Sequence, residues 1–454
     1  MESEILRQLK SQFPERASQE RQLEELVTNF GLLSNSEIKF IVGDILCLAK
    51  ILYDSGAKNV VQETQIKILQ LRMGDEGNRE FLKKLEYLEK CLTNFKPAIF
   101  DNIATHFAEV YHIPAEFVTC LPKVSGQQVG TKVEVKKTPE DDHPIYFHVK
   151  THQEFCSKSH SNFLAITSDG TGYVNFKELF IYKVLEHLGV GPKTLFIIDK
   201  DLAHCRVEES ILIATQDLGY TKRPAERKKS FRIFSEVRDD LSTQPMTDIN
   251  VATRRDIVII DMLSRIFLLE DVMINQGNFG MVMSQATDDV DASAKIKWKI
   301  LDFLPPKREL GRGDDYTYGR HYPGGVNIFH SFKIGNVSHT YDREGLEIIG
   351  TILAEENARD MWLPALEQLT QRGGAASTQI SVPDAMEIAF GEVMRFMEEN
   401  RERLQIKPER FARRMEDLDL YRNSVLRNFA EMEDGIKKEL GAARPTSPRM
   451  GPVT

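Results

Sequence analysis

The pattern of apolar and polar positions changes near residue 120. Before it, apolar residues recur at helical spacing in several long segments, and strand-like alternation is absent. Gly56 directly follows such a segment, at a position that favours a helix stop. The pattern predicts an all-helical domain over residues 1–120, which fits either docking of a protein partner or bracing of the domain that follows.

Residues 121–220 show the alternation of half-buried strands, interrupted by a single helical segment. Gly126 and Gly130 lie in the first predicted turn, and spaced glycines there let backbone N–H groups approach a phosphate closely. The strand predicted over residues 145–150 has an apolar face and a polar face, and Lys150 lies on the polar one. This region is therefore expected to form an antiparallel sheet with one helix.

The helix in this region is predicted to begin after Asn175 and to stop at Gly189. Glu178 is the lone charge at the head of its apolar seam. Its spacing from Asn175 resembles a capping box, which would use the carboxylate locally. Alternatively, Glu178 points at the sheet and pairs with Lys150. The spacing leaves both alternatives open.

Residues 221–440 are predicted to be mainly helical, with a hairpin of two short strands over residues 279–283 and 295–301. The second strand alternates cleanly, with Trp298 on its apolar face. Asn278 stands at the entrance of the hairpin and Asp302 at its exit, so two oxygen ligands lie side by side. Mg²⁺ takes ligands of this kind, usually one or two from protein and the rest from phosphate and water.

The order of these features along the chain is a glycine turn, Lys150, Glu178, a strand that ends at residues 216–219, Asn278 and Asp302. This order resembles the protein-kinase-like superfamily over roughly residues 120–400. Its atypical members are the most similar, namely the phosphatidylinositol 3/4-kinase, HipA-type and actin–fragmin kinase branches. The resemblance implies an α+β, two-lobed kinase-like fold after the helical domain, with an N-lobe over 121–220, a C-lobe over 221–440 and a disordered tail over 441–454.

The resemblance also implies ATP and Mg²⁺ as cofactors. Glycines would approach the phosphates, a strand lysine paired with a helix glutamate would hold them, and the backbone of residues 214–218 would bind adenine. The residues implied to contact the nucleotide are Gly126, Gly130, Lys150, Glu178, Gln216 and Leu218. Asn278 and Asp302 are the implied metal ligands.

The sequence departs from the family where the catalytic base is expected. Met273 stands five residues before Asn278, at the position of the family's aspartate, and a methionine cannot accept a proton. Asp271 is the candidate base in a shifted loop, and Asn275 is a candidate for orienting the substrate. Leu304 also replaces the glycine that follows the metal-binding Asp–Phe pair.

Three hypotheses follow from these residues. The first is an active kinase that transfers phosphate to a protein or lipid hydroxyl. The second is a catalytically impaired pseudokinase that acts as a protein-interaction scaffold, with its N-terminal helices as the candidate docking region. The third is a purely helical scaffold in which the kinase-like order is coincidental.

Composition narrows the setting in which the chain works. A net charge of −9 argues against a general nucleic-acid binder, because phosphate contacts need a basic surface. No apolar run reaches the roughly 18 residues of a membrane helix. The five cysteines are scattered without C-x-x-C spacing, which fits reduced thiols. A soluble cytoplasmic or nuclear protein is expected.

Overall fold

The chain forms two compact units, each built from helices and antiparallel strands. The computed structural model describes residues 11–74, 78–123, 129–141, 143–151, 174–198, 211–219, 231–243, 250–269, 272, 277–282, 297–303, 305, 356–370, 380–404 and 406–441. Unit 1 comprises Met1–Asn175, Thr194–Asp217 and Arg403–Gln405. Unit 2 comprises Phe176–Lys193, Leu218–Glu402 and Ile406–Thr454. The predicted α+β class with a helical N-terminal region is confirmed.

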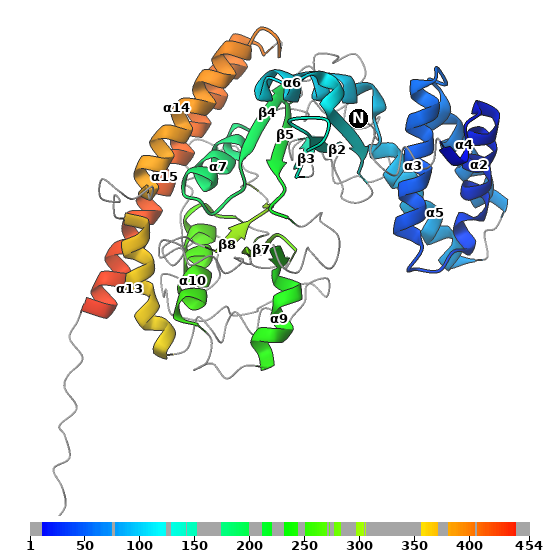
Figure 1. Cartoon of the computed structure of the whole chain (residues 1–454). Coiled ribbons are helices and arrows are strands. Elements are labelled where there is room, and N and C mark those ends of the chain that lie inside the picture. The colour runs from blue at the N-terminus through cyan, green and yellow to red at the C-terminus, as the bar shows by residue number, and fades with distance from the viewer. Residues whose placement is uncertain are drawn as a thin grey trace, which may run out of the picture. The chain divides into compact units, whose positions relative to one another are not determined.

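Unit 1 begins with a series of helices (Figure 1). They are α2 (Arg16–Asn29), α3 (Ile38–Asp54), α4 (Val60–Gly74), α5 (Arg79–Asn94) and α6 (Phe100–Tyr111), joined in part by the short 3₁₀ helices η1 (Phe30–Leu32), η2 (Pro97–Ile99) and η3 (Ala115–Phe117). Gly56 has a positive φ of 100° just after α3, as a helix stop requires. Ile45, Leu85 and Ile103 are fully buried between the helices.

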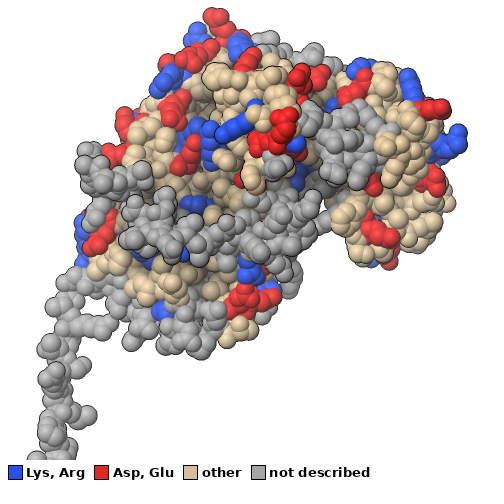
Figure 2. Space-filling view, in the orientation of Figure 1, with Lys and Arg blue, Asp and Glu red and all other residues tan. Residues whose placement is uncertain are grey.

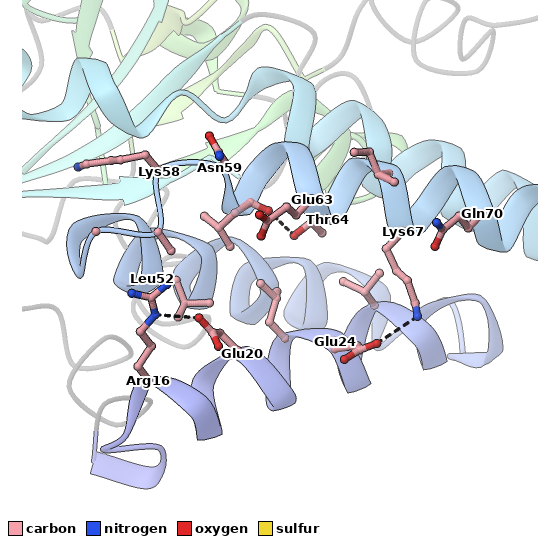
Figure 3. Close-up of a pocket in the computed structure, with 16 residues that line it drawn as sticks. Arg16, Glu20, Glu24, Leu52, Lys58, Asn59, Glu63, Thr64, Lys67 and Gln70 are labelled. Atoms are coloured by element: carbon pink, nitrogen blue, oxygen red, sulfur yellow. Dashed lines mark hydrogen bonds and ion pairs between the residues drawn. The ribbon is translucent and has the colours of Figure 1, made fainter.

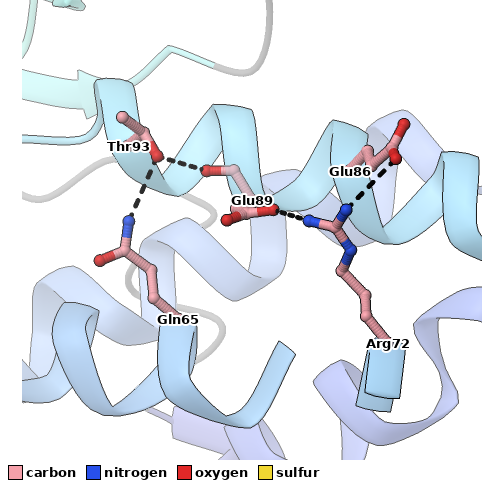
Figure 4. A network of polar contacts seen from close by, with 5 residues as sticks. All are labelled: Gln65, Arg72, Glu86, Glu89 and Thr93. Carbon is pink, nitrogen blue, oxygen red and sulfur yellow. Dashed lines mark hydrogen bonds and ion pairs between the residues drawn. The ribbon is translucent and has the colours of Figure 1, made fainter. Parts of the chain in front are cut away.

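Polar contacts join α4 to α5 (Figure 4). Arg72 pairs with Glu89 and, at 3.3 Å, with Glu86. One turn further along α5, the Thr93 hydroxyl accepts a hydrogen bond of 3.2 Å from Gln65. These groups are only partly buried, so the contacts contribute little to the stability of the fold. Their main effect is to set which faces of α4 and α5 meet.

Five antiparallel strands follow in unit 1. They are β1 (Val118–Pro122), β2 (Gly130–Val135), β3 (Ile145–Thr151), β4 (Thr194–Ile198) and β5 (Ile211–Gln216), in the sheet order β1-β2-β3-β5-β4. The apolar face of β3 packs on α6, where the rings of Phe107 and Phe147 lie 4.8 Å apart. Because the unit contains this sheet, the hypothesis of a purely helical scaffold is wrong.

Unit 2 contains a second antiparallel sheet and the C-terminal helices. Its elements are α7 (Phe176–His187), β6 (Phe231–Ile233), α9 (Phe234–Thr243), α10 (Val251–Ile266), β7 (Phe279–Val282), β8 (Trp298–Ile300), α13 (Glu356–Thr370), α14 (Val382–Asn400) and α15 (Pro408–Gly441). The strand order is β6-β7-β8. Trp298, on the predicted apolar face of β8, and Trp362 of α13 are fully buried in this unit.

Helix α7 begins directly after Asn175 and ends as predicted. Gly189 has a φ of 67°, and the amides of Gly189 and Val190 donate to the carbonyls of Glu186 and Leu185. This pair of bonds is a Schellman motif. Lys177, at the other end of α7, pairs with Asp417 of α15 at 3.0 Å. Among the described helices, none is long and apolar enough to cross a membrane.

Candidate functional site

The hairpin of β7 and β8 brings Asn278 and Asp302 together. Phe279 pairs with Ile300 in the antiparallel register, so the residues just outside the strands are neighbours. The carbonyl oxygen of Asn278 accepts from the amides of Leu301 at 2.7 Å and Asp302 at 3.2 Å. The geometry therefore places the two predicted metal ligands side by side in unit 2.

The Asp302 carboxylate is oriented by two donors. Its Oδ1 accepts a hydrogen bond of 3.1 Å from the Tyr182 hydroxyl and another of 3.0 Å from the Phe303 amide. The rings of Tyr182 and Phe303 also pack at 4.5 Å. Tyr182 was not among the site residues predicted from the sequence. The available signal was its place one turn after Glu178, on the same side of the predicted helix.

Two anchors fix the second strand of the hairpin. The Lys297 amide, just before β8, donates to Asp256 Oδ2 of α10 at 2.7 Å. The Ile300 amide donates to the carbonyl of Val190, just after α7, at 2.7 Å. Burial raises the pKa of the Asp256 carboxyl, and the Lys297 amide and the Arg255 guanidinium oppose this shift.

Helix α15 holds the end of α10, from which the chain runs toward Asn278. The Tyr421 hydroxyl donates to the Phe267 carbonyl at 2.7 Å, and the Asn428 amide donates to the Ile266 carbonyl at 3.2 Å. Leu268 then turns the chain with a φ of 54°. Carbonyls at a helix end lack partners within the helix, and here side chains of α15 supply them.

Several of the predicted positions lie outside the described residues. They are Gly126, Asp271, Met273, Asn275 and Leu304. The base of the expected reaction, and with it the choice between kinase and pseudokinase, thus stays a prediction.

Lys150 lies in unit 1, on β3 in the middle of the five-stranded sheet, and is only 8% exposed. Its neighbours in the register are Gly130 of β2 and Ile213 of β5. A Cβ at Gly130 would lie 2.1 Å from the Val149 carbonyl oxygen, so close strand packing alone explains this glycine.

Glu178 belongs to α7 of unit 2 and is fully buried. Its pairing with Lys150 stays a prediction. Gln216 is the last residue of β5 and Leu218 lies just beyond it; adenine binding by this segment stays a prediction. Between them, the Asp217 amide donates to the Tyr146 carbonyl at 2.8 Å, so this N–H is already used by the sheet.

A groove of about 770 Å³ lies between α2 and α4 (Figure 3). Its lining includes the buried side chains of Leu23 and Val60 and the ion pair of Lys67 with Glu24 at 3.1 Å. None of the predicted site residues lines it. Among the described residues there is also no cluster of three His, Cys, Asp or Glu side chains that would hold a metal by themselves.

On the face seen in Figure 2, acidic and basic side chains are interspersed.

Comparisons with protein-family models, with curated proteins and with solved structures find no match for this chain.

Proposed function

We propose that the protein is a kinase-like phosphotransferase that uses a Mg²⁺-bound nucleoside triphosphate, with ATP as the reference substrate, and a protein or lipid hydroxyl as acceptor. The observation that carries the proposal is the pairing of Asn278 with Asp302 at the ends of one hairpin. The resemblance adds Lys150, which belongs to unit 1, as the cation for the phosphates.

The donor set fits a nucleotide-bound Mg²⁺ better than a metal caged by protein alone. One carboxylate and one side-chain amide supply few oxygens, and Mg²⁺ completes its shell with phosphate oxygens and water. When bound, the metal would neutralise charge that develops on the transferred phosphoryl group.

The chain's own residues would act by positioning. The Tyr182 hydroxyl and the Phe303 amide donate to Oδ1 of Asp302. These two bonds fix the orientation of the carboxylate before a ligand binds. Lys150 would hold phosphate oxygens as a point charge. Phosphoryl transfer needs little covalent chemistry from the protein, so positioning and charge neutralisation supply most of the catalysis.

The test is Mg²⁺-dependent ATP turnover by the purified full chain. Asp302→Ala is expected to lower kcat by on the order of 10²–10³-fold, the usual effect of losing a preorganised electrostatic group. Asp239→Asn, at an exposed position of α9, is the control and should leave turnover unchanged. Equal turnover by the wild type and Asp302→Ala would contradict the proposal.

The pseudokinase is the second candidate, favoured by Met273 and by the hydrogen bonds that already occupy Asp302 Oδ1. It predicts that Mg²⁺ and ATP raise the thermal midpoint without any turnover. Robust turnover that Asp271→Asn abolishes would exclude this candidate and would identify the base as well.

A further inference from the structure

Three ionisable side chains gather at one end of the sheet face that carries Lys150. Lys132 of β2 lies opposite His148 of β3 in the register, and His148 lies opposite Thr215 of β5. Asp217 directly follows β5. Three neighbouring strands thus bring Lys132, His148 and Asp217 together, beside the segment where the proposed function places the base of the nucleotide.

Asp217 orients His148. Its Oδ2 lies 3.2 Å from Nε2 of the imidazole, and the Asp217 side chain is 2% exposed while that of His148 is 41% exposed. Because a carboxylate accepts hydrogen bonds, this contact assigns the proton of a neutral imidazole to Nε2.

Lys132 is held in a poorly solvated place. Burial lowers the pKa of its ammonium, and the charge of Asp217 opposes this shift. Among the residues that the structure describes, none forms an ion pair with Lys132. A partly buried cation without such a partner costs stability, and groups of this kind concentrate at functional sites.

We propose that Lys132 reads the nucleotide base and makes the site prefer guanine over adenine. An ammonium donates to acceptors, and guanine presents two neighbouring acceptors, O6 and N7, on one edge. Adenine presents an amino donor beside N7, which an ammonium opposes. The charges of Lys132 and Asp217 balance, so this end of the face suits a neutral heterocycle, whereas Lys150 suits phosphate.

This inference rests on the proposed function and names its substrate. The test compares Kd values for Mg²⁺-GTP and Mg²⁺-ATP by calorimetry on the full chain. The wild type is expected to bind GTP on the order of tenfold more tightly, the discrimination that one well-placed contact to a base edge gives. Lys132→Met should remove the difference. Lys132→Gln should reverse it, because an amide matches the N6 and N7 pattern of adenine.

Lys137→Met is the matched control, since Lys137 is exposed just beyond the end of β2 and should leave both Kd values unchanged. Circular dichroism spectra check that each variant is folded. Equal Kd values for the two nucleotides in the wild type, or a ratio that Lys132→Gln leaves unchanged, would overturn the base assignment while the proposed function stands. Binding of neither nucleotide would overturn both.

Discussion

Helix α10 contains a buried ion pair, and the loss of either residue is expected to lower the stability of the protein strongly. Arg265 Nε lies 2.8 Å from Asp261 Oδ2, and Asp261 is fully buried. Burial raises the pKa of Asp261 and the Arg265 charge lowers it. The pair helps to place the end of α10, and neither charge would be tolerated there alone.

Arg265→Leu should destabilise the protein by about 3–5 kcal/mol at pH 7, because it leaves a buried carboxylate without its partner. With the guanidinium gone, the folded-state pKa of Asp261 rises further above the unfolded value. A raised carboxyl pKa means stability that is fully present below the unfolded pKa and lost as pH rises through the folded one. The deficit relative to the wild type should therefore shrink as pH falls from 7 toward 5.

Thermal midpoints measured across this pH range check the prediction. Asp261→Leu combined with Arg265→Leu is the control, because removing both charges should recover much of the loss. A deficit that is the same at every pH would show that the effect comes from packing and not from the unpaired carboxylate.

Sequence reasoning finds site residues when their partners are close in the chain. Asn278 and Asp302 were predicted as neighbours because alternation along the hairpin fixes its register. Tyr182 reaches Asp302 across 120 residues, and Asp217 reaches His148 across 69. A local period can place Tyr182 on the same side of its helix as Glu178, but it cannot predict which distant residue each side chain contacts.

Helices and strands likewise have local features that the sequence predicts and tertiary contacts that it does not. The strand-like runs that became β4 and β5, and the stop of α7 at Gly189, follow from local propensity and cap geometry. The packing of α7 does not follow from such local features. Nine of its 12 residues are buried, among them Lys177 and Glu178, because α14 and α15 contribute to its cover. A helix buried on most sides has no single apolar stripe from which its partners can be predicted.

The capped end of α10 gives a prediction about an element. Asn428→Leu should leave the Ile266 carbonyl buried without its side-chain donor, at a cost of about 1–3 kcal/mol. Turnover should fall too, because the chain runs from this helix end to Asn278. Asn423→Leu is the matched control on an exposed face of the same helix α15.

The thermal midpoint and the turnover of both variants are measured together. Both the thermal midpoint and the turnover are expected to fall in Asn428→Leu and to stay unchanged in Asn423→Leu. Equal behaviour of the two variants would mean that water replaces the lost donor and that the cap does not position the loop.

The arrangement of elements into units depends on contacts that are distant in sequence. The sequence pattern changes near residue 120, yet α3, α6 and the apolar face of the sheet share one hydrophobic cluster in unit 1. The chain passes between the two units after residues 175, 193, 217, 402 and 405. Such repeated passage cannot be predicted from local patterns, and we expect it to couple the folding of the two units.

The two units carry different intrinsic probes, which makes this coupling measurable. Both tryptophans, Trp298 and Trp362, are fully buried in unit 2. Among the described residues of unit 1, three cysteines are buried free thiols, and burial raises their pKa values to about 12, about 11 and about 12 for Cys47, Cys91 and Cys120. These thiols stay protonated at pH 8, so they should react only after unit 1 opens.

Urea unfolding is followed by tryptophan fluorescence and by thiol labelling, in a background in which Cys156 and Cys205 are replaced by serine. Because the chain passes repeatedly between the units, the two probes are expected to give one midpoint. Trp362→Phe leaves Trp298 as the only fluorescent tryptophan and controls for the choice of probe. In this variant too, the fluorescence midpoint and the labelling midpoint should coincide. Labelling at a urea concentration well below the fluorescence transition would instead show that unit 1 opens independently, and the two units would then be separate folding domains.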